Sequence, residues 1–176
     1  TILISSALYL FFITLRDFFI KKYGNVSQNI AHFGFSLLIL SILFNNLFSS
    51  EIITNLKVGE TFTSPNTKIV FKSINKKEEK NYISIRANFR IENLNGIIDD
   101  LSPELRIYNQ PNIATSEADI KTSLLSDKFI VVNVVQNQDY FNVRYQVKSF
   151  MLWIWLSVIL ISLAGFISFF KKEYEK

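Results

Sequence analysis

The chain has 176 residues, of which 49% are hydrophobic and 19% are charged, with a formal net charge of +4 and no cysteine. The lack of cysteine excludes a disulfide scaffold, a zinc–thiolate or iron–sulfur site and a thiol nucleophile. Segment 49–147 holds 12 basic and 12 acidic side chains, so the whole positive excess lies beside the apolar ends. That distribution argues against a nucleic-acid partner, which requires a basic folded surface, and is typical of a membrane protein.

The first apolar segment, residues 2–15, is followed at once by Arg16 and Asp17. As a helix it covers only about 21 Å, less than the roughly 30 Å of a bilayer core. We therefore predict a transmembrane helix over 1–20 that is truncated at its N-terminus, in a chain that is the C-terminal part of a longer protein. An interfacial helix is the less favoured alternative, because no polar face repeats at helical spacing.

A second transmembrane helix is predicted over 28–48, where the interior is rich in leucine, isoleucine and phenylalanine. Ser27, which follows Gly24 and Asn25, is the predicted N-cap of this helix. The helix carries the single histidine of the chain, His32, near its N-terminal end.

Segment 49–147 predicts an extracytoplasmic domain, a small antiparallel β-sandwich or barrel, so the fold class is a membrane protein of the α+β type. Residues 82–92 alternate apolar and polar side chains, with the period of two that marks a half-buried strand. A shorter strand is expected over 68–74, with a charged turn over 75–80. The acidic pairs 78–79 and 99–100 are expected on solvated surface.

Two further strands are predicted close to the last apolar segment. The β-branched run 129–135 is typical of a strand buried on both faces. Asn137, Gln138 and Asp139 then turn the chain into an alternating strand over 141–148. This strand leads almost directly into the last span, so we expect the domain to sit against the membrane surface.

A third transmembrane helix is predicted over 149–170, because residues 150–170 contain no charge and cover about 31 Å as a helix. Trp153 and Trp155 are expected in the interfacial aromatic belt. Basic residues then indicate the orientation. Six lie in the first loop and in the tail 171–176, namely Arg16, Lys21, Lys22, Lys171, Lys172 and Lys176, against three near the opposite face, Lys57, Arg144 and Lys148. The loop and the tail are therefore predicted to be cytoplasmic.

The chemistry available to the chain centres on His32. No partners for a Ser-His-Asp triad, no phosphate-binding glycine loop and no zinc-type spacing are present. A titratable residue inside a span is a functional candidate, and a neutral imidazole is a good haem-iron ligand. Gln28, His32 and Ser36 form a polar stripe at i, i+4 and i+8, which we expect to face other helices, with Ala31 and Gly34 leaving room for a bulky group. A structural hydrogen bond and a proton-handling role stay open.

The motif Ala31-His32-Phe33-Gly34, which opens an apolar helix, resembles the Ala/Gly-His-Leu-Gly motif of the cytochrome c maturation haem lyase family, protein F (CcmF). Further similarities follow in the family's order, namely Pro103-Glu104-Leu105-Arg106-Ile107-Tyr108, Thr115-Ser116-Glu117-Ala118, Asp127-Lys128-Phe129, Asn142-Val143-Arg144-Tyr145, Trp153-Ile154-Trp155 and Gly165. The resemblance covers nearly the whole chain. The family's tryptophan-rich haem-handling segment and its second membrane histidine are not in this sequence.

The resemblance implies a multi-pass protein of the bacterial inner membrane, or alternatively of the mitochondrial inner membrane, that attaches haem to apocytochrome c. Such proteins take haem from a haem chaperone, work with other maturation subunits and hold a haem b between two membrane histidines. By motif position, His32 would be one of the two iron ligands. No residue is assigned a catalytic role, and Arg106, Glu117, Trp153 and Trp155 match family positions without an assigned chemistry. The chain alone is expected to be inactive and to bind haem poorly.

Two other functions stay open. One is a non-enzymatic, membrane-anchored β module that docks partner proteins and uses His32 for helix packing. The other is a part of a proton-handling membrane complex in which His32 is a relay.

Overall fold

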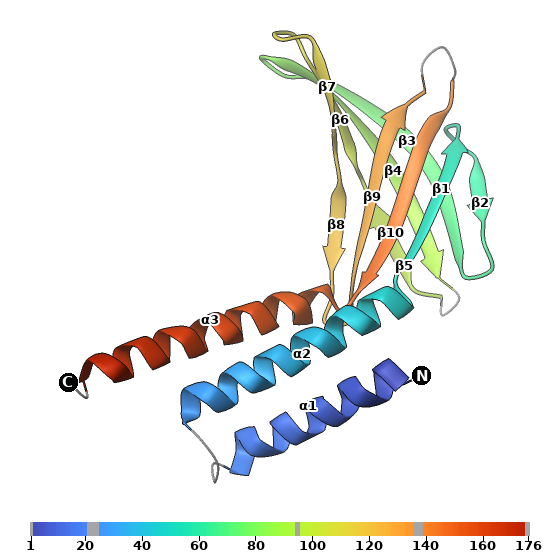
Figure 1. The fold of residues 1–176 in the computed structure, drawn as a ribbon. Helices are drawn as coiled ribbons and strands as arrows, with labels where there is room; N and C mark the ends of the chain where they lie inside the picture. The colour runs from blue at the N-terminus through green and yellow to red at the C-terminus, as the bar shows by residue number, and fades with distance from the viewer. Residues whose placement is uncertain (1, 21–24, 94–95, 136–138, 175–176) are drawn as a thin grey trace. The chain divides into compact units, whose positions relative to one another are not determined.

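The computed structural model describes residues 2–20, 25–93, 96–135 and 139–174, which divide into two units. The helical unit holds residues 1–49, 123–127 and 148–176, and the β unit holds residues 50–122 and 128–147. Figure 1 shows the elements of both units in chain order. The predicted positions Lys21, Lys22, Gly24, Lys176 and the pair 137–138 lie outside the described residues.

The helical unit consists of α1 (Ile2–Ile20), α2 (Val26–Phe48) and α3 (Met151–Tyr174). All three helices are long and apolar enough to cross a membrane. α1 continues past Arg16 and Asp17, whose side chains pair with each other at 3.0 Å. Because α2 packs against both α1 and α3, it forms the middle of the bundle (Figure 1).

Small side chains line the contacts between these helices. Ser36 on α2 and Ser157 on α3 are completely buried, and Ala164 on α3 is only 1% exposed. Small residues let helix backbones approach closely where lipid supplies no hydrophobic driving force. The large side chains Phe35 and Trp155 are exposed instead, as expected of helices whose outer surface faces lipid.

The prediction that Ser27 caps α2 is wrong. The helix begins at Val26, and its N-cap is Asn25. The Ser27 hydroxyl donates to the carbonyl oxygen of Ala164 on α3 at 2.7 Å. Because residue 164 is small, α3 comes close enough to accept this bond, and the hydroxyl joins two helices instead of capping one.

The β unit is a sandwich of two antiparallel sheets. The first has the strand order β1-β10-β9-β8, with β1 (Ser50–Leu56), β10 (Phe141–Ser149), β9 (Ser126–Val134) and β8 (Asp119–Thr122). The second has the order β2-β3-β4-β6-β7, with β5 beside β4. Its strands are β2 (Thr61–Thr63), β3 (Thr67–Glu78), β4 (Tyr82–Asn93), β5 (Ile98–Leu101), β6 (Glu104–Tyr108) and β7 (Ile113–Glu117).

The hydrophobic core of the sandwich draws on both sheets. Phe71 on β3 stacks on Phe89 on β4, with ring centroids 4.4 Å apart. Ile130 on β9 and Val143 and Tyr145 on β10 belong to the same buried cluster. The strands predicted over 82–92 and 141–148 are confirmed as β4 and β10.

Three local predictions in this unit are wrong. The charged segment 75–80 was predicted to be a turn, but residues 75–78 belong to β3, in which Glu78 pairs with Ile83. Backbone hydrogen bonds in the hairpin form whether or not the side chains are buried, so the strand can continue through charged, solvent-exposed residues. The β9 strand is not buried on both faces: Ile130 and Val132 are buried, but Val134 is exposed, because a sandwich covers only one face of each sheet.

The third correction concerns the acidic pair 99–100. Both residues lie in β5, and alternation along the strand places them on opposite faces. The Asp99 side chain is only 2% exposed and binds Lys121 on β8 and Lys128 on β9, each at 2.6 Å. Asp99 therefore joins one sheet to the other, whereas Asp100 is exposed as predicted.

Candidate functional site

His32 lies in the second turn of α2, and its side chain is exposed on the bundle. Among the described residues, none forms a hydrogen bond or an ion pair with the imidazole. The exposed neighbours Gln28 and Phe35 lie one turn away on either side, so His32 is part of an outward face of α2. The structural hydrogen bond considered from the sequence is therefore not made by the described part of the chain.

The polar stripe expected to include Ser36 is broken. Ser36 is buried and shares a hydrogen bond of 2.6 Å with Thr14 on α1. Each step of four residues turns the helix by about 40° beyond a full circle. Ser36 has therefore rotated toward α1, whereas Gln28 and His32 stay on the outer face.

The room expected beside Gly34 is also occupied. A Cβ atom on Gly34 would lie 3.0 Å from Cγ1 of Ile161 and 3.2 Å from Cβ of Leu160. The glycine thus lets α3 pack against α2. Because Gly34 faces α3 and Ser36 faces α1, the direction in which His32 points is fixed by two packed faces of the same helix.

The chemistry of His32 fits a haem-iron ligand. No group of three His, Cys, Asp or Glu side chains that could hold a metal ion exists among the described residues. A porphyrin supplies four iron ligands itself and needs only axial ligands from protein. A single exposed imidazole without a described partner can provide one of these, and a second histidine ligand would have to come from outside this chain, which has one histidine.

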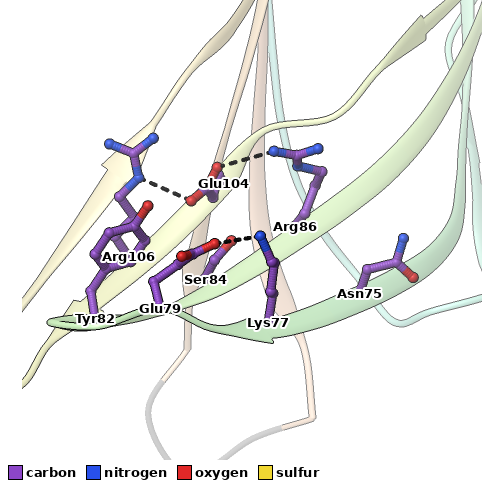
Figure 2. A pocket seen from close by; sticks show the side chains of 8 residues that line it. All are labelled: Asn75, Lys77, Glu79, Tyr82, Ser84, Arg86, Glu104 and Arg106. Atoms are coloured by element: carbon purple, nitrogen blue, oxygen red, sulfur yellow. Dashed lines mark hydrogen bonds and ion pairs between the residues drawn. The ribbon is translucent and has the colours of Figure 1, made fainter.

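The β unit contains a second candidate, a charged cleft on the sheet formed by β3, β4 and β6 (Figure 2). The cleft has a volume of about 310 Å³ and is lined by polar side chains, namely Asn75, Lys77, Glu79, Tyr82, Ser84, Arg86, Glu104 and Arg106.

Glu104 is the centre of this charged cleft. Its carboxylate accepts a hydrogen bond from Nε of Arg106 at 2.9 Å and a longer one from Nη2 of Arg86 at 3.5 Å, as Figure 2 shows. Arg86 lies directly opposite Glu104 in the β4–β6 register, and Arg106 lies two residues along the same strand face. A second carboxylate, Glu117 on β7, lies 3.8 Å from Arg106.

The charges of the cleft are held in place by these pairs. The hydrogen bond from Arg106 keeps the pKa of Glu104 below its ordinary value, and the same bond raises the pKa of the guanidinium. Glu79 likewise raises the pKa of Lys77 through a contact of 2.6 Å. The pKa shifts of Glu104, Arg106 and Lys77 all lead away from neutral pH, so these three side chains stay charged there and suit the cleft to recognising a charged partner.

Four residues match family positions without an assigned chemistry, and the structure brings two of them together. Arg106, which lines the cleft, forms an ion pair of 3.8 Å with Glu117. Trp153 and Trp155 lie on α3, where the Trp153 indole donates to the carbonyl oxygen of Leu124 at 2.8 Å. Arg86 was not predicted as the partner of Glu104, because their pairing depends on the register of two strands. The one sequence signal was the alternation that put Arg86 on the polar face of its strand.

Three apolar helices and an antiparallel sandwich define the class of this protein, a membrane protein with a folded β domain between its spans. Residues 47–149, more than half of the chain, match the family described as the CcmF C-terminal beta-sandwich. The chain belongs to this family, as its sequence motifs predicted.

Relatives and a solved structure agree with this assignment. The chain is 25% identical over 165 residues to "Cytochrome c-type biogenesis protein CcmF" of Haemophilus influenzae, covering 94% of this chain and 25% of that protein. It is 23% identical to the protein of the same name from Pseudomonas aeruginosa, covering 84% and 22%. The chain thus spans about a quarter of the length of these curated relatives. A solved structure, "Cytochrome c Heme Lyase CcmF", has the same fold, with a TM-score of 0.65, 18% identity and coverage of 93% of this chain and 30% of that one.

Proposed function

We propose that this chain is the C-terminal part of a cytochrome c haem lyase subunit, which attaches haem covalently to apocytochrome c and holds a haem b partly through His32. Family membership supports the general role, because relatives are named cytochrome c-type biogenesis proteins and the solved structure is named a haem lyase. The observation that carries the ligand assignment is the exposed His32 imidazole, which has no partner among the described residues.

In this proposal the residues of the chain position one iron ligand. His32 offers an imidazole nitrogen on the outer face of α2. The bond between Ser36 and Thr14 and the contact of Gly34 with α3 hold the helix against rotation. A haem b bound there would supply one-electron chemistry. A second histidine ligand would come from another part of the complete protein.

We also propose that the protein lies in the bacterial inner membrane with its β unit in the periplasm. The relatives named above are bacterial, and the basic residues favour a cytoplasmic loop and tail. On that side of the membrane the β unit would meet apocytochrome c, the haem chaperone and other maturation subunits. A reporter that is active only in the periplasm, fused after residue 93, should be active, and one fused after residue 174 should be inactive.

The ligand assignment is tested by the optical spectrum of the complete protein purified from membranes. The wild type should show a bis-histidine b-type spectrum, and His32→Ala should lose or strongly shift it, with partial recovery on adding imidazole. Gln28→Ala is the matched control, because Gln28 is exposed on the same face one turn earlier. An unchanged spectrum in His32→Ala, while the β unit stays folded, would contradict the assignment.

The charged cleft favours a second function, a module that docks partner proteins. The exposed guanidinium of Arg86 and the partly exposed one of Arg106 keep free donors for an acidic partner. In that case Arg86→Glu should lower cytochrome c maturation and leave any haem spectrum intact. For a proton relay through His32, the described residues offer no hydrogen-bonded or ion-paired partner.

A further inference from the structure

The loop between β8 and β9 exposes two adjacent leucines. Residues 123–126 form its tip, where the amide of Ser123 donates to the carbonyl oxygen of Ser126 at 3.0 Å and closes the turn. Leu124 is 70% exposed and Leu125 is 62% exposed. Turns of this length ordinarily carry Gly, Pro, Asn, Asp or Ser. A pair of exposed leucine side chains at such a tip therefore indicates that the tip does not face water.

The same loop is fixed to the beginning of α3. The Trp153 indole donates to the carbonyl oxygen of Leu124, and the amide of Phe150 donates to that of Leu125, both at 2.8 Å. Both bonds use backbone acceptors of the loop, so they fix its backbone without involving either leucine side chain. The loop belongs to the helical unit together with α3.

Phe150 stiffens this attachment. It has a positive φ of 60°, which is uncommon for a bulky residue and costs free energy unless surrounding contacts hold it. Its ring packs against Phe44 on α2, with centroids 5.1 Å apart. The strained corner thus holds the loop next to the first turn of α3.

The first turn of α3 marks the edge of a membrane span. Residues Met151–Phe170 are the most apolar of the three candidate spans in the described residues. Trp153 and Trp155 stand at its beginning, where tryptophan is enriched at the level of lipid headgroups. Because the loop backbone is bonded to residues 150 and 153, its tip lies at the same level.

We propose that Leu124 and Leu125 insert into the interfacial layer of the bilayer and form a lipid anchor separate from the three helices. Leu152 and Trp155, in the first two turns of α3, are also exposed. Lipid is the occupant that fits, because the loop is bonded to the first turn of a helix that is long and apolar enough to cross a bilayer. The inference requires that α3 crosses a bilayer and does not depend on the haem assignment.

Spin labels measure the depth of the loop directly. The chain contains no cysteine, so Leu125→Cys provides one site in it, after removal of any cysteine elsewhere in the complete protein. Two reference labels have similar exposure: Leu163→Cys in the middle of α3 and Ile113→Cys on β7. Power saturation in nanodiscs compares collisions with oxygen, which concentrates in lipid, and with a water-soluble nickel chelate.

The label at 125 should resemble the one at 163, with an oxygen-to-nickel accessibility ratio several-fold above that at 113. A ratio equal to that at 113 would place the loop in water and overturn the proposal. A label that neither reagent reaches would indicate a protein partner on the loop, which also overturns it. Leu124→Cys repeats the measurement with Leu125 intact, and both substitutions keep the two backbone acceptors.

Discussion

The helical unit and the β unit differ in the size of the side chains that they bury completely. In the β unit, Phe71 and Phe89 are buried, and Arg86 is exposed. In the helical unit, Ser36 and Ser157 are buried, and Trp155 is exposed. Each pattern follows from the solvent outside: water excludes apolar surface, whereas lipid tails are as apolar as leucine and leave close packing to small residues. This difference within one chain supports a membrane around the helices and water around the sandwich.

The largest expected effect comes from making the same substitution in both units. Phe89→Ala should lower the free energy of unfolding of the β unit by about 3–5 kcal/mol, because it removes a stacked ring from a closed core and leaves a cavity. Phe169→Ala on the exposed side of α3 should cost less than about 1 kcal/mol, since lipid fills the space. Denaturation of the complete protein in micelles, followed by hydrogen exchange of each unit, measures both. Equal losses would contradict a lipid-facing α3.

The two units also differ in how far the sequence predicted them. Hydropathy and period-two alternation are local properties, so the apolar helices, the strand of Phe89 and the position of His32 were predictable. The direction of His32 was not, because it depends on which faces of α2 meet α1 and α3. The cleft around Glu104 depends on pairing across strands. The ion-pair partner of Asp99, Lys128, lies 29 residues away in the sequence. No pattern inside one segment contains that information.

The next effect concerns the ion pairs of Asp99, a residue that was predicted from the sequence to lie in solvent. Asp99→Asn should destabilise the β unit by about 2 kcal/mol, because it removes the charge from two hydrogen bonds to lysines and leaves one bond unmade. Asp100→Asn is the matched control. Its exposed pairs with Lys72 and Arg90 are screened by water, so this variant should lose much less stability than Asp99→Asn. An equal loss in the two variants would show that Asp99 is not buried between the sheets.

The same pairs predict a pH dependence. Burial by itself would raise the pKa of Asp99, but hydrogen bonds from Lys121 and Lys128 outweigh it and hold the pKa below the ordinary 3.8. The nearby Tyr145, whose pKa burial and the charge of Asp99 raise to about 12, stays neutral. Because the pKa of Asp99 is lowered, the folded state binds fewer protons than the unfolded state near pH 3.8. The contribution of Asp99 is complete above about pH 4 to 5 and is lost as the pH falls toward its folded-state pKa.

Urea titrations from pH 7 to pH 3 separate this contribution from those of other carboxylates. The difference in unfolding free energy between wild type and Asp99→Asn should be constant at neutral pH and shrink on acidification. A difference that grows on acidification would mean that the carboxylate is protonated in the folded protein. That result would remove the proposed link between the sheets.

The smallest expected effect tests the packing of the helical unit. Gly34→Ala and Gly165→Ala gain the same intrinsic helix propensity, about 1 kcal/mol, so their difference isolates the space around each glycine. A Cβ at Gly165 meets nothing within 4 Å, whereas one at Gly34 meets a side chain and the backbone nitrogen of Ile161, at 3.0 and 3.3 Å. Gly34→Ala should therefore be less stable than Gly165→Ala by about 1–2 kcal/mol, measured by thermal unfolding in nanodiscs. Because Gly34 lies two residues from His32, the same variant should shift the b-type spectrum, which Gly165→Ala should leave unchanged. Equal stability and equal spectra would mean that α3 does not hold the face of α2 that aims the imidazole.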